Sequence, residues 1–133
     1  KLAFSKAREQ SFPVSLDVVT GDRREFLNRI AHSYAVIISS LGDVSPNTIL
    51  EAIQYGKPFI LTRETGLYEK LKDIAVWVDP EDVNDIANKI KWLSDEKNYE
   101  AQKCKVEAFS FTHSYADIAS EILSIVRNLV KNS

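Results

Sequence analysis

The order of apolar and polar positions along the chain predicts strands and helices that alternate. Four short apolar runs, rich in β-branched residues, have the length of strands: 14–19, 35–38, 58–61 and 75–78. The stretches between them, near 23–33 and 46–55, repeat apolar residues on one helical face. Strands that alternate with helices at this spacing form βαβ units with right-handed crossovers. We therefore predict an α/β fold, in which helices cover both faces of a four-stranded parallel sheet in a three-layer, Rossmann-like arrangement.

Beyond the last predicted strand the pattern becomes helical. The segment 82–93 carries an apolar stripe, the segment 97–108 is also helical, and the segment 115–130 repeats apolar residues at the spacing of an amphipathic helix. No repeat, low-complexity segment or linker separates these helices from the predicted sheet. We therefore expect residues 1–133 to form one domain, which the helices of 82–130 complete.

The composition narrows the classes of function. A net charge of −2 and an isoelectric point near 5.7 indicate no broad basic surface, so we expect no nucleic-acid partner. The sequence shows no apolar run long enough to cross a bilayer and no secretory signal, which indicates a cytoplasmic protein. Cys104, His32 and His113 do not have metal-ligand spacing. We therefore expect no metal site and no bound cofactor.

The segment 39–51, with the sequence SSLGDVSPNTILE, leads from the second predicted strand into a helix. Open α/β sheets bind ligands at the carboxyl ends of their strands, so this loop is the first candidate site. Ser45 and Pro46 fit the N-cap and the first helical residue. The amides of Asn47 and Thr48, together with the helix dipole, would then favour a phosphate group. The alternative is an ordinary helix cap that binds no ligand.

Glu51 adds a carboxylate to this segment. On the predicted helix it lies on the side that carries Asn47 and Gln54, opposite to the apolar face. We expect it to point along the wall of the cleft, where it would accept hydrogen bonds from ribose or sugar hydroxyls. The alternative is a solvated surface glutamate.

Several more residues in and after this segment occur in a characteristic order and spacing. They are Asp43, Pro46, Glu51-Ala52, Gly56-Lys57-Pro58, Gly66 and Glu69, followed by AVWVDPED at 75–82. In this order and spacing, the stretch 35–81 resembles the carboxyl-terminal, donor-binding domain of the retaining glycosyltransferases of GT-B fold, known as family four or group one. The sequence FSFTHSYADIASEIL at 109–123 is similar to the start of the last helix in that family.

The resemblance implies a nucleoside-diphosphate sugar donor, a UDP-sugar or a GDP-sugar, as substrate. It implies that Glu51 binds the ribose and that Asp43 faces the donor sugar, where the family usually has the longer glutamate. The donor phosphates would contact Ser45, Asn47 and Thr48. Gly42 in the preceding loop and Arg63, at the carboxyl end of another predicted strand, complete the candidate residues.

The resemblance also implies what would lie outside these 133 residues. The family neutralises the leaving diphosphate with an Arg and a Lys, and no matching pair precedes Val14. We therefore expect a domain that is truncated at its start and inactive alone. An amino-terminal domain would bind the glycan or lipid-linked acceptor, and any peripheral membrane association would belong to the full-length protein.

Two alternatives to a glycosyltransferase remain at this point. A nucleotide-sugar epimerase of GT-B fold would share the donor cleft, and its products would distinguish it. A non-catalytic α/β binding module is the alternative from another class. A receiver-like module would need an acidic cluster after its first strands, but Asp17 and Asp22 are widely separated and Ser39 ends the next strand.

Overall fold

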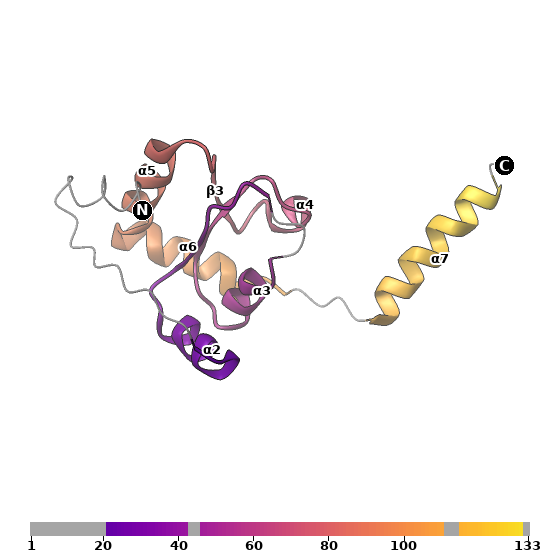
Figure 1. Cartoon of the computed structure of the whole chain (residues 1–133), viewed down its shortest axis with the longest axis horizontal. Coiled ribbons are helices and arrows are strands. Elements are labelled where there is room, and N and C mark those ends of the chain that lie inside the picture. Colours follow the sequence, from indigo (N-terminus) through magenta and orange to yellow (C-terminus); the bar gives the residue numbers. More distant parts are fainter. Residues whose placement is uncertain (1–20, 43–45, 111–114, 132–133) are drawn as a thin grey trace.

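The computed structural model describes residues 21–42, 46–110 and 115–131. Helices surround a parallel sheet, and the last helix stands apart from it (Figure 1). The elements are, in order, α2 (Arg23–His32), β1 (Val36–Ile38), α3 (Asn47–Gln54), β2 (Phe59–Thr62), α4 (Tyr68–Leu71), β3 (Val76–Val78), α5 (Val83–Leu93), α6 (Glu96–Ala108) and α7 (Tyr115–Lys131). The three described strands are parallel and lie in the order β1-β2-β3. The predicted α/β, Rossmann-like fold is confirmed. The predicted strand at 14–19 lies outside the described residues.

The central strand β2 is buried along its whole length. In the register of the sheet, Ile60 pairs with Ile37 of β1 on one side and with Val76 of β3 on the other. A strand with neighbours on both edges and helices on both faces has no solvent-exposed position. This explains why β2 is apolar up to its last residue, Thr62, without the polar alternation of a half-exposed strand.

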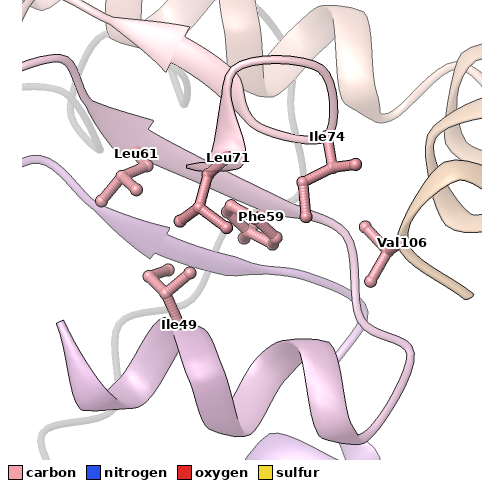
Figure 2. Packing of buried hydrophobic residues seen from close by; sticks show 6 residues of the cluster. All are labelled: Ile49, Phe59, Leu61, Leu71, Ile74 and Val106. Atoms are coloured by element: carbon pink, nitrogen blue, oxygen red, sulfur yellow. The ribbon is translucent and has the colours of Figure 1, made fainter. Parts of the chain in front are cut away.

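Successive side chains of β2 enter two different core clusters, because they point to opposite faces of the sheet. The first cluster comprises Ile49, Phe59, Leu61, Leu71, Ile74 and Val106, and brings α3, α4 and α6 together (Figure 2). The second cluster comprises Ile60, Val76, Val78, Ile86 and Leu93, and brings α5 against the sheet. Helices therefore cover the sheet on both faces, as predicted.

Helix α6 contacts both sides of this core. Its Val106 lies in the first cluster, while Tyr99 packs against the second. Between them, the buried Gln102 donates a hydrogen bond from Nε2 to the carbonyl oxygen of Ile74, just before β3. This helix therefore holds the edge of the sheet by a polar contact as well as by apolar packing.

Two tyrosines connect the segment before β1 to the turn between α5 and α6. The rings of Tyr34 and Tyr99 are stacked, with centroids 4.0 Å apart. Tyr34 donates its hydroxyl to the carbonyl of Leu93 at 3.2 Å, and Tyr99 donates to the carbonyl of Tyr34 at 3.2 Å. Partial removal of the Tyr34 hydroxyl from water, and then the neighbouring Tyr99 and carboxylates, raise its pKa above 10.0.

Helix α7 confirms the predicted amphipathic helix, but its apolar face is exposed. Figure 1 shows α7, in yellow, standing apart from the sheet and from the other helices. Six of its apolar side chains are between 48% and 71% exposed: Ile122, Leu123, Ile125, Val126, Leu129 and Val130. In the part of the chain that the structure describes, no helix has the length and apolar character needed to cross a membrane.

Candidate functional site

The carboxyl ends of all three described strands open onto one pocket of about 560 Å³. Its lining comes from the three strand ends and the start of α5: Leu41 after β1, Arg63 and Glu64 after β2, Val78 at the end of β3, Asp79, Pro80 and Glu81 after it, and Asp85 in α5. Parallel α/β sheets bind their ligands at this edge, and the volume is in the usual range for a small-molecule site. The pocket therefore lies where the sheet topology favours a ligand.

Half of the described residues that line this pocket are acidic. Two of its carboxylates are used within the loop, since Asp85 accepts from the N–H of Asp79 at 2.9 Å and Asp79 accepts from the N–H of Glu81 at 2.9 Å. Arg63 is the one cationic side chain among the described lining residues, and it is exposed. An anionic ligand in this pocket would therefore be attracted by Arg63 and repelled by the acidic lining residues.

Helix α3 begins one residue later than predicted. Pro46, with ψ of 88°, has a non-helical backbone and is the N-cap, so it is not the first helical residue. Its carbonyl accepts from the N–H of Ile49 at 2.9 Å and of Leu50 at 3.4 Å. Because the proline ring has no oxygen, it provides no side-chain cap. The predicted cap Ser45 lies outside the described residues, as does Asp43.

The first helical amides are those of Asn47 and Thr48, and first-turn amides have no acceptor within their own helix. Asn47 is exposed, Thr48 is half-buried, and Gly42, at the end of the described loop after β1, is exposed. In the same loop the hydroxyl oxygen of Ser40 is buried and has no hydrogen-bond partner among the described residues. A buried hydroxyl normally finds a partner, so a bound molecule or water near Ser40 would satisfy it.

Glu51 is buried, which differs from the expected position on an open cleft wall. Only 10% of its side chain is exposed, and Oε1 accepts a hydrogen bond from Nη2 of Arg23 at 2.6 Å. Helix α2 packs against α3 and covers this side of the helix. The solvated-glutamate alternative is therefore wrong. The periodicity of α3 identifies the face of Glu51 but cannot show that a second helix lies on it.

Of the described candidate residues, Arg63 lines the pocket at the strand ends. The others are not among its described lining residues: Gly42, Asn47, Thr48 and Glu51. Asp79 was missed as a candidate, although it directly follows the predicted strand at 75–78. Arg23 had no such signal, because it is 28 residues from Glu51 in sequence. Within the described ranges, no three His, Cys, Asp or Glu side chains are grouped so that they could hold a metal ion.

Comparison with known families gives one match. The family described as "Glycosyl transferases group 1" matches residues 7–96, a stretch that contains the three described strands and helices α2 to α5. No curated protein and no solved structure matches the chain. The match covers more than half of the 133 residues, and it includes the strand ends that line the pocket. The chain therefore belongs to the group 1 glycosyltransferase family.

Proposed function

We propose that this chain is the donor-binding domain of a retaining glycosyltransferase of GT-B fold. Its substrate is a nucleoside-diphosphate sugar, a UDP-sugar or a GDP-sugar, and the sugar passes to a glycan or lipid-linked acceptor held by another domain. The observation that supports this proposal is the polar pocket at the carboxyl ends of β1, β2 and β3, in a chain of the group 1 family.

The diphosphate has two sources of favourable charge in this proposal. The first-turn amides of Asn47 and Thr48, which follow Ser45 in the sequence, bind the phosphates at the positive end of the α3 dipole. Arg63 adds a full positive charge from the end of β2. When the bond between the sugar carbon and the diphosphate oxygen breaks, the electron pair leaves with the diphosphate, and these groups stabilise the developing charge.

The sugar and the ribose have separate contacts in this proposal. Asp43, which precedes α3 in the sequence, binds the donor sugar in this proposal, and the absence of a side chain at Gly42 lets the ligand approach the backbone. Glu51 accepts from the ribose hydroxyls through the carboxylate oxygen that Arg23 does not hold. The acidic lining residues Glu64, beside Arg63, and Asp79, after β3, are suited to sugar hydroxyls rather than to phosphates.

The test is a titration of the chain with UDP, GDP and their sugar conjugates, in which amide NMR chemical shifts are monitored. We expect shifts at 40–42, 46–51 and 63–64 with a preference for one base. Arg63→Gln should weaken binding about tenfold, or ~1.4 kcal/mol. Lys72→Gln is the matched control, because Lys72 is exposed, pairs with Glu69 and lies outside the pocket lining. If no nucleotide shifts these amides at millimolar concentration, the proposal is wrong.

A further inference from the structure

The Glu51 carboxylate and Arg23 form an asymmetric ion pair. The Glu51 side chain is 10% exposed and that of Arg23 is 73% exposed. A buried carboxylate requires a charged or hydrogen-bonding partner, because its loss of hydration is otherwise uncompensated. Arg23 supplies that partner through a short hydrogen bond of 2.6 Å between Nη2 and Oε1. The remaining guanidinium donors stay at the surface.

The two oxygens of Glu51 differ. Oε1 is held by Arg23, whereas no hydrogen bond to Oε2 is present within the part of the chain that the structure describes. The carboxylate is therefore held by Arg23 at one oxygen, while its other oxygen has no hydrogen-bond partner among the described residues.

The stability of α2 does not explain why an arginine stands at position 23. Arg23 is the first residue of α2, directly after the N-cap Asp22. A cation at a helix N-terminus is disfavoured by the helix dipole. Asp22 accepts from the N–H of Glu25 at 2.8 Å and so secures the start of the helix, while the buried Ile30 fixes its other end. The start of α2, which carries Arg23, is thus held in place.

We infer that Arg23 is a positioning residue, which orients the Glu51 carboxylate so that Oε2 accepts hydrogen bonds from the ribose hydroxyls of a bound nucleotide. This inference rests on the proposed donor-binding function. It adds that the site distinguishes ribonucleotides from deoxyribonucleotides, and that α2 takes part in this discrimination. Without the anchor at Oε1, Glu51 would lose its orientation, and the hydroxyl contacts would weaken while the phosphate and base contacts remained.

The experiment compares dissociation constants for the ribonucleoside diphosphate with those for its 2′-deoxy and 3′-deoxy forms, using whichever of UDP and GDP binds. In the unmodified chain we expect the loss of one hydroxyl to weaken binding about tenfold, as when a buried polar group loses its partner. The measured quantity is the ratio of the dissociation constant of a deoxy form to that of the ribonucleoside diphosphate. In Arg23→Gln this ratio should fall to about twofold, because the hydroxyl contacts are already weakened. Arg23→Lys keeps the charge but not the planar fork, so its ratio should lie between the two.

The matched control is Arg29→Gln on the same helix. Arg29 pairs with Glu25 at 3.0 Å on an exposed surface, and its removal should leave the ratio unchanged. If Arg23→Gln weakens all three nucleotides by the same factor, Arg23 only joins α2 to α3, and the inference is overturned. If Arg23→Gln does not fold, the ratio for Arg23→Lys decides, and an unchanged ratio overturns the inference. If the unmodified chain binds no nucleotide, the proposed function itself fails.

Discussion

Gly56 shows how a single residue determines where a helix ends. It follows α3 with φ of 62°, in the left-handed region. The N–H of Lys57 donates to the carbonyl of Ala52 at 2.9 Å, and that of Gly56 donates to Ile53 at 3.0 Å. These two bonds form a Schellman motif, in which glycine avoids the steric cost of a Cβ. Gly56 thereby turns the chain from α3 into β2.

We predict that Gly56→Ala lowers the free energy of unfolding by about 1–2 kcal/mol, the cost of a left-handed conformation for a residue with a side chain. The new Cβ would also lie 3.2 Å from Cγ of Glu107 in α6. Urea denaturation followed by circular dichroism measures the change. The control is Gly42→Ala, where a Cβ meets no atom within 4 Å, so we expect a change below about 0.5 kcal/mol. Equal losses at both positions would contradict this explanation.

At the scale of elements, α6 connects the two faces of the sheet. Its overall amphipathic character is weak, because only Gln102 and Val106 are buried along its length. The sequence predicts this helix from its propensity but not which side faces the core. Gln102 shows why, since a buried polar residue does not contribute to an apolar stripe. Its position is explained only by the Ile74 carbonyl that it satisfies.

We predict that Gln102→Leu destabilises the protein by about 1–3 kcal/mol, because it leaves the Ile74 carbonyl buried without a partner. The measurement is the midpoint of thermal or urea unfolding. Lys103→Ala on the same helix is the control. Its pair with Glu107 is long, at 3.9 Å, and solvent-exposed, so we expect less than about 0.5 kcal/mol. A stability of Gln102→Leu at or above that of the unmodified chain would show that this hydrogen bond is dispensable.

At the scale of the whole molecule, the two core clusters include no described residue of α7. The stability of the sheet therefore depends on α2 to α6. We predict that removal of residues 111–133 changes the free energy of unfolding by less than about 1 kcal/mol. We also expect the amides of α7 to exchange with solvent much faster than those of β2, because a helix of 17 residues is marginal without packing. A loss above about 2 kcal/mol would show that α7 contributes to the core.

For the candidate site, as for the fold, one part could be predicted from the sequence and another part could not. Arg63 could be placed from the sequence, because it closely follows an apolar run and strand ends meet at one edge of a parallel sheet. The burial of Glu51 and its pairing with Arg23 could not be placed, because a contact across 28 residues depends on how α2 packs against α3. The predicted start of α3 was one residue too early, since proline is compatible with both the N-cap and the first helical position.

The sequence by itself determined the class of fold and the order of its elements. Apolar runs of strand length, helical periodicity and the turn residues between them are local properties, and they sufficed to predict three described strands and the helices that alternate with them. Only the tertiary structure decided which side chains meet. Glu51 with Arg23, Gln102 with Ile74 and Tyr34 with Tyr99 are contacts between elements distant in sequence, and their formation depends on packing that no local pattern records.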